Sequence, residues 1–240
     1  MRARSANPEY GRVVRPPGAH LNSRGCATAQ TEPRMLDRDI RQALRERLVA
    51  EHGSEALIVD ELALREGSVR ADLCLVNGAL SGFEIKSAAD SLGRLPAQVA
   101  GYSRVFDYAA LVADARHLEQ AGDQLPDWWG VYEARRGRKG PRIVRIRRGR
   151  RNPALDVASV VQLLWRDEAL AVLEQHGIAD GLSRCTRSQL WQLLVDEVPA
   201  SQLCAAVREA LKARGDWRVS HEPAKVPEPW WRSLVDASAS

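Results

Sequence analysis

The sequence lacks the features that mark disulfide-rich, zinc-binding and membrane-spanning proteins. Its four cysteines lie far apart, at Cys26, Cys74, Cys185 and Cys204. Without a Cys-x-x-Cys pair, the common zinc and redox motifs are excluded and a disulfide scaffold is disfavoured. No apolar run approaches the roughly 18 residues of a membrane span, and none follows the N-terminal arginines as in a secretory signal. We therefore expect a cytoplasmic protein with no membrane partner.

Other catalytic signatures are missing as well. The five histidines share no metal-ligand spacing, and neither a Gly-x-Ser-x-Gly elbow nor a phosphate-binding loop occurs. We expect no small-molecule cofactor. Lysine is scarce, with 4 Lys against 31 Arg. Because this chain supplies Arg where only positive charge is needed, each Lys marks a position worth closer attention.

The charge is unevenly distributed along the chain. The net charge is +4 overall, and it is +4 over residues 1–34, −7 over 35–134, +10 over 135–151 and −3 over 152–240. We call residues 135–151 the basic strip. A phosphate backbone is the natural partner for such a strip, and a merely solvated hairpin is the alternative.

The pattern of apolar residues divides the chain into four parts. Residues 1–34 are proline-rich without periodicity and are predicted to be disordered, with Met35 as an alternative translation start to Met1. Residues 35–151 are predicted to form an α/β domain, 154–221 a helical domain and 222–240 a tail. The predicted strands are 57–64, 69–76, 81–87, 108–113, 129–134 and 142–147. The predicted helices are 37–52, 92–106, 114–121, 155–176, 188–197 and 201–214.

Acidic residues and one lysine are predicted to meet on neighbouring strands. Side chains alternate along a strand, so Glu84 and Lys86 share one face while Phe83 and Ile85 share the other. A hairpin turning at the Asn77-Gly78 signal would bring Asp72 close to Glu84.

Carboxylates that meet repel one another, and a hard divalent cation relieves this repulsion. Mg²⁺ takes oxygen ligands and can activate a bound water for attack on a phosphodiester, so Mg²⁺, or Mn²⁺ in its place, is the expected cofactor. The alternative is an ordinary ion pair on an edge strand.

The order of elements and the strand motifs resemble the PD-(D/E)XK, or restriction-endonuclease-like, nuclease superfamily over about residues 37–113. The resemblance is closest to an uncharacterised bacterial family within it. The matching residues are Asp60-Glu61-Leu62, Gly67, Arg70-Ala71-Asp72, Asn77-Gly78, Gly82-Phe83-Glu84-Ile85-Lys86-Ser87, Asp90, Leu92, Arg94-Leu95, Gln98 and Tyr102. Ala71 stands where the superfamily motif has Pro.

The resemblance implies an α/β fold with a restriction-endonuclease-like core, in which a helix, three strands, a helix and a further strand form a mixed sheet, followed here by a small helical domain. It implies that Asp72 and Glu84 bind the metal, with the Ile85 carbonyl as a third ligand, and that Lys86 positions the attacking water. It also implies that Glu61 is an additional acid, a role that Glu46 or Glu51 could take instead.

Two further groups of residues are expected to bind nucleic acid. Arg94, Gln98 and Tyr102 recur every four residues and form a polar stripe beside the acidic site. In the basic strip, Arg145, Arg147 and Arg148 are expected to hold a DNA backbone. Trp128 and Trp129 could stack on bases, although core packing is the more common role of tryptophan.

These observations predict a Mg²⁺-dependent deoxyribonuclease that hydrolyses phosphodiester bonds through a metal-activated water. DNA is its expected partner, and a homodimer is one assembly that the protein could form. Two alternatives stay open. One is a catalytically inactive nucleic-acid-binding module of the same fold, and the other is a protein-interaction module.

Overall fold

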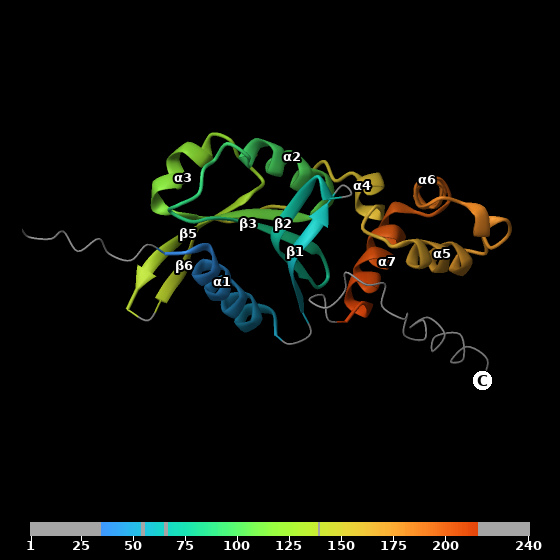
Figure 1. Cartoon of the computed structure of the whole chain (residues 1–240), viewed down its shortest axis with the longest axis horizontal. Helices are drawn as coiled ribbons and strands as arrows, with labels where there is room; N and C mark the ends of the chain where they lie inside the picture. The colour runs from blue at the N-terminus through green and yellow to red at the C-terminus, as the bar shows by residue number, and fades with distance from the viewer. Residues whose placement is uncertain (1–34, 54–55, 65–66, 139, 216–240) are drawn as a thin grey trace, which may run out of the picture. The chain divides into compact units, whose positions relative to one another are not determined.

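The structure is a computed structural model that describes residues 35–53, 56–64, 67–138 and 140–215 (Figure 1). The described residues belong to one compact unit. The predicted disordered segment at 1–34 and the predicted tail at 222–240 lie outside the described residues. No described helix combines the length and the hydrophobicity that a membrane span requires.

A six-stranded mixed sheet forms the centre of the described structure. Its strands lie in the order of the chain, and the sequence predicted each of them to within a few residues. They are β1 (Leu57–Leu64), β2 (Val69–Val76), β3 (Leu80–Lys86), β4 (Tyr108–Asp114), β5 (Gly130–Gly137) and β6 (Gly140–Arg147). Strands β1 to β3 are antiparallel, β3, β4 and β5 are parallel, and β6 returns antiparallel to β5.

The turn between β2 and β3 forms where the Asn-Gly signal predicted it. The Asn77 side chain accepts a hydrogen bond from the Ala79 amide at 3.0 Å, which is the local bond that favours Asn in turns. The resulting register pairs Leu73 with Phe83 and Val76 with Leu80. Asp72 and Glu84 are therefore carried by adjacent strands.

Helices cover both faces of the sheet (Figure 1). Helix α1 (Asp37–His52) buries Ile40, Leu44 and Leu48 in the same apolar cluster as Phe83 and Ile85. Helices α2 (Leu95–Val105) and α3 (Ala115–Gly122) pack into the cluster on the opposite face. Phe83 and Ile85 face α1. Because side chains alternate along β3, Glu84 and Lys86 must face the opposite side, where α2 lies.

The predicted single helix at 155–176 is wrong. The chain forms α4 (Val157–Val161) and α5 (Arg166–Gln175), with a break between them. In the break, Trp165 is extended and its amide donates to the Glu168 carboxylate at 2.7 Å, which starts a new helix by capping it. The Leu163 carbonyl is held by the Arg214 guanidinium instead of a helical amide.

The remaining helices follow the prediction. After a short 3₁₀ helix, η2 (Leu182–Arg184), come α6 (Arg187–Glu197) and α7 (Ala200–Ala213). Thr186 caps α6 by accepting from the Gln189 amide at 3.3 Å. Buried side chains of α4 to α7 belong to the same apolar cluster as those of α2, so these helices and the sheet share a core. The predicted division between 151 and 154 stays a prediction.

Candidate functional site

A buried ion pair lies on β3, where the sequence placed an acidic residue two positions before a lysine. The Lys86 Nζ lies 2.7 Å from the Glu84 Oε1, and the two residues are 3% and 1% exposed. The pair therefore faces α2 and is not an exposed edge-strand contact. Charges are this deeply buried only when they are paired and hydrogen-bonded.

Helix α2 supplies the hydrogen bonds that complete the pair. The Gln98 side chain accepts from the Lys86 Nζ at 3.0 Å and donates to the Glu84 Oε1. The Tyr102 hydroxyl donates to the Glu84 Oε2 at 2.8 Å. The four-residue spacing that predicted a polar stripe thus brings these two side chains to one carboxylate, while Arg94 lies exposed at the start of α2.

Asp72 joins the same network from β2. Its Oδ2 accepts from the Ile85 amide at 2.8 Å, and its own amide donates to the Tyr102 hydroxyl at 3.2 Å. Its Oδ1 lies 3.3 Å from the Arg41 guanidinium of α1. Arg41 was not among the predicted site residues, because a contact between a helix and a strand that lie far apart in the chain leaves no local pattern.

The network raises the affinity of its carboxyl groups for protons. Burial, together with the neighbouring Asp72 carboxylate, raises the pKa of Glu84 from 4.5 to about 7, although Lys86 and Tyr102 act in the opposite direction. Burial also raises the pKa of Asp72, against the effects of the Ile85 amide and Arg41. Burial and the Glu84 carboxylate raise the pKa of the Tyr102 phenol well above its usual range.

Glu61 stands opposite Asp72 in the register, because its neighbours Asp60 and Leu62 pair with Leu73 and Ala71. Its φ of 54° is left-handed, a conformation that non-glycine residues rarely adopt. Its side chain is 52% exposed and lies 3.4 Å from Arg70. Its role as an additional acid stays a prediction.

The two alternatives for that acid are engaged elsewhere. Glu46 accepts a hydrogen bond from Gln42 at 2.8 Å, and Glu51 lies 2.7 Å from Arg47. Both belong to α1, on the side of the sheet away from Glu84 and Lys86.

The basic strip forms the β5–β6 hairpin and the segment that follows it. Most of its described arginines are exposed: Arg135, Arg136, Arg138, Arg142, Arg145, Arg148, Arg150 and Arg151. Arg147 differs from these, since its guanidinium donates to the carbonyls of Trp129 and Pro126 at 2.9 and 3.1 Å. Arg147 therefore fastens the end of β6 to the start of β5.

Trp128 and Trp129 belong to the core. They are 8% and 0% exposed, and the Trp129 ring lies 5.4 Å from that of Tyr102. The side chains therefore do not present a free face for a base, and the core-packing alternative is confirmed.

The fold and this network define a mixed α/β protein built on a six-stranded sheet, with a buried carboxylate–ammonium network between β3 and α2. Residues 31–219 match the family model described as bacteriophage P4 protein cII. Since this match extends over most of the sequence, the chain belongs to the bacteriophage P4 protein cII family.

A curated relative agrees with this assignment. Protein cII of Enterobacteria phage P4 is 31% identical over 125 residues, which cover 52% of this chain and 47% of that protein. The chain thus spans about half the length of the curated relative that it matches. Among solved structures, a protein of unknown function from Silicibacter pomeroyi is similar at a TM-score of 0.38 and 17% identity, over 62% of this chain and 94% of that one. A similarity this weak identifies neither a fold nor a function.

The family corrects the prediction of a metal-dependent deoxyribonuclease. Both the family and the curated relative are phage protein cII, and neither is described as a nuclease. The enzymatic prediction relied on the residue pattern around Glu84 and Lys86. Such a pattern indicates which groups lie together, but it does not show that they catalyse a reaction.

The carboxylates of Asp72 and Glu84, as they are arranged here, do not suit a divalent cation. Each of their oxygens already accepts from a protein donor, and Arg41 and Lys86 neutralise their charges. Among the residues that the structure describes, no three His, Cys, Asp or Glu side chains gather as a metal site. Binding of Mg²⁺ or Mn²⁺ by Asp72, Glu84 and the Ile85 carbonyl stays a prediction, and we assign no chemical step to it.

Proposed function

We propose that this protein binds DNA through the basic strip and does not cleave it, and that its core is a restriction-endonuclease-like scaffold. The scaffold part rests on the helix, three strands, helix and strand that run from α1 to β4. It also rests on the meeting of Asp72, Glu84, Lys86 and Gln98. In this proposal the buried network stabilises the junction of β3 and α2 instead of activating water.

The exposed arginines of the strip carry the DNA-binding part of the proposal. Within the hairpin, Glu133 is the single acidic residue, and it pairs with Arg135 at 2.8 Å. Arg145 and Arg148 are exposed and form no ion pair within the described part of the chain. Guanidinium groups displayed in this way bind phosphates by charge-assisted hydrogen bonds, independently of base sequence.

The test measures the salt dependence of DNA binding. Fluorescence anisotropy with a labelled duplex is recorded over a range of salt concentrations for the wild type and for the double variant Arg145→Gln/Arg148→Gln. We expect weaker binding in the variant and a slope of log K against log salt that is smaller by about 2, because each lost phosphate contact removes about 0.9 from it. The duplex should be recovered intact.

A matched control removes two positive charges elsewhere. Arg38 and Arg184 are exposed and lie outside the strip, so Arg38→Gln/Arg184→Gln should leave the slope unchanged. Equal slopes for the wild type and the strip variant would refute DNA binding through the strip. Absence of DNA binding in the wild type would leave the protein-interaction alternative.

The same assay tests the predicted cation. A Mg²⁺ ion shared between the carboxylates and a phosphate would tighten binding in Mg²⁺ relative to EDTA, and Asp72→Asn would remove that difference. Arginine contacts alone predict binding in EDTA as well, because they need no metal.

A further inference from the structure

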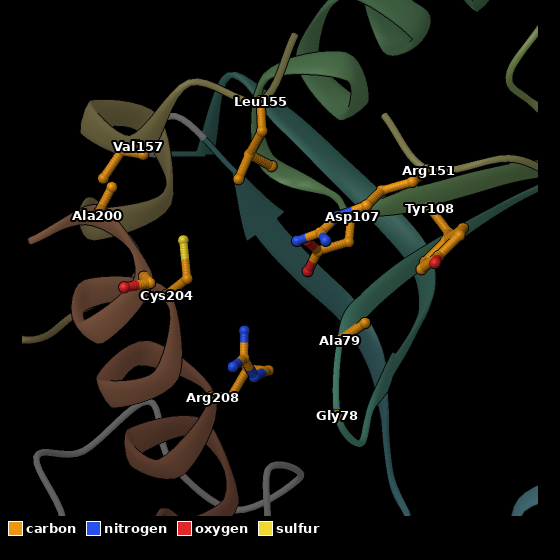
Figure 2. Close-up of a pocket in the computed structure, with 11 residues that line it drawn as sticks. Gly78, Ala79, Asp107, Tyr108, Arg151, Leu155, Val157, Ala200, Cys204 and Arg208 are labelled. Carbon is orange, nitrogen blue, oxygen red and sulfur yellow. The ribbon is translucent and has the colours of Figure 1, made fainter. Parts of the chain in front are cut away.

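A pocket lies where the β2–β3 turn, the start of β4 and helix α7 meet (Figure 2). Its cavity volume of about 450 Å³ is within the range of small-molecule sites, roughly 300–1,000 Å³. Its lining comes from residues 78–79, 107–108, 151–157 and 200–208. No local sequence pattern indicates this pocket, because its residues come from four separate parts of the chain.

The charges of the pocket favour an anion. Arg151 and Arg208 are its two cations, and Asp107 is its single acid. Asp107 is already engaged, with its Oδ2 accepting from the Leu80 amide at 2.9 Å and its Oδ1 at 3.5 Å from Arg151. Arg208, on α7, forms no ion pair or hydrogen bond with any residue of the described ranges, so no described carboxylate neutralises its charge.

The two cations act on the same space from opposite walls. Figure 2 shows Cys204 and Arg208 on α7, facing Asp107 and Arg151 across the pocket. The pKa of the Cys204 thiol depends on the charged groups of both walls. Burial and Asp107 raise this pKa, whereas Arg208 and Arg151 act in the opposite direction.

The first turn of α7 adds neutral donors to the two guanidinium groups. The Gln202 and Leu203 amides donate to the Pro199 carbonyl, whereas the amides of Ala200 and Ser201 have no partner within the helix. Ser201, which is exposed, also lines the pocket. This end of a helix also carries a partial positive charge, which adds to the attraction for an anion.

The remaining walls suit the organic part of a nucleotide. Tyr108 is 39% exposed at the start of β4, so its ring offers a face on which a base can stack. Leu155 and Val157 supply apolar surface nearby.

We propose that this pocket binds a phosphate-bearing nucleotide, with Arg208 and Arg151 on the phosphate and Tyr108 beside the base. The phosphate can belong to a free mononucleotide or to a bound DNA strand. The inference goes beyond DNA binding by the basic strip, because Arg208 and the first turn of α7 lie outside residues 135–151.

Calorimetric titration of the full chain with AMP, inorganic phosphate and adenosine tests the proposal. AMP and phosphate should bind, and adenosine should bind at least about tenfold more weakly than AMP, since it lacks the phosphate that accepts charge-assisted hydrogen bonds from the arginines. Arg208→Gln should weaken AMP binding about tenfold or more. Arg184→Gln, a charge removed from η2 outside the pocket, should leave AMP binding unchanged.

A second variant distinguishes the loss of a phosphate contact from the loss of the fold. The Arg151 side chain is 77% exposed, so Arg151→Gln should fold normally and still weaken AMP binding. Absence of AMP and phosphate binding at millimolar concentrations, or equal AMP affinities in the wild type and both pocket variants, would overturn the proposal. Displacement of AMP by duplex DNA would identify a DNA phosphate as the natural ligand, and simultaneous binding would identify a free nucleotide.

Alkylation of Cys204 tests whether AMP binds in this pocket. Saturating AMP should slow its modification by iodoacetamide, measured by peptide mass spectrometry, while Cys185, which does not line the pocket, should react at an unchanged rate. An unchanged rate at Cys204 would place the ligand elsewhere and overturn the proposal.

Discussion

Glu84 shows how one residue depends on its burial and its partners. An exposed glutamate on a strand would be ionised at neutral pH and bound to water. Here the residue is 1% exposed, and its carboxylate accepts from Lys86, Gln98 and Tyr102. The same burial that makes these bonds strong also disfavours the charge, so the proton is held more tightly than in the unfolded chain.

The raised pKa of Glu84 predicts a pH-dependent stability. Between pH 4.5 and about 7 the folded protein keeps a proton that the unfolded chain has lost, so stability should fall as pH rises through this window and level off above it. The change attributable to Glu84 should be at most about 3 kcal/mol. Denaturant unfolding of the wild type and Glu84→Gln from pH 4 to 8 measures it, and the variant should lose most of the slope.

Glu209→Gln serves as the control for this measurement. Glu209 is 53% exposed and pairs with Lys212 at 3.2 Å, so its removal should leave the pH dependence as in the wild type. A slope that persists in Glu84→Gln would show that other groups determine it.

At the scale of elements, the segment after β6 fastens α4 to the C-terminal end of α2. The Asn152 side chain donates to the carbonyls of Ser103 and Phe106 at 2.7 and 2.9 Å. The Asp156 amide donates to the Arg104 carbonyl at 2.9 Å. These are carbonyls at a helix end, which lack helical partners and must be satisfied from outside.

Asn152→Ala should therefore destabilise the protein by about 1–3 kcal/mol, because Asn152 is 8% exposed and its loss leaves buried carbonyls unpaired. Gln192→Ala is the matched control, since its amide bonds Asp196 on an exposed surface at 2.9 Å and should cost no more than about 0.5 kcal/mol. Denaturant unfolding at one pH compares the two. Similar losses for both variants would contradict a specific role for Asn152.

At the scale of the described molecule, the sheet and the C-terminal helices share one apolar cluster. Leu111 of β4 and Leu203 of α7 are both fully buried members of it. Helix α7 contacts β2, and α4 contacts α2. A core that passes between two parts of a chain couples their unfolding.

This coupling predicts cooperative unfolding from β1 to α7. Leu203→Ala should cost about 2–5 kcal/mol and lower the protection of β2 and α2 as well as that of α7 in hydrogen exchange. Loss of protection confined to α4–α7 would show that the helical part unfolds by itself, as the predicted domain boundary would have it.

Local sequence patterns predicted the strands, most of the helices, the β2–β3 turn, and a polar stripe with Gln98 and Tyr102 beside the site of Glu84 and Lys86. These follow from period-two and period-3.6 patterns and from turn residues, which act over a few positions. Only the packing of separate elements produced the Arg41–Asp72 pair, the contacts of Arg147 with Trp129 and Pro126, the Arg214–Leu163 contact beside the break at Trp165, and the pocket at Arg208. Each joins residues from separate elements, so packing fixes it and no local pattern records it. The enzymatic prediction was wrong for a related reason. A residue motif specifies which groups lie together, and the same arrangement of groups occurs in proteins with different functions.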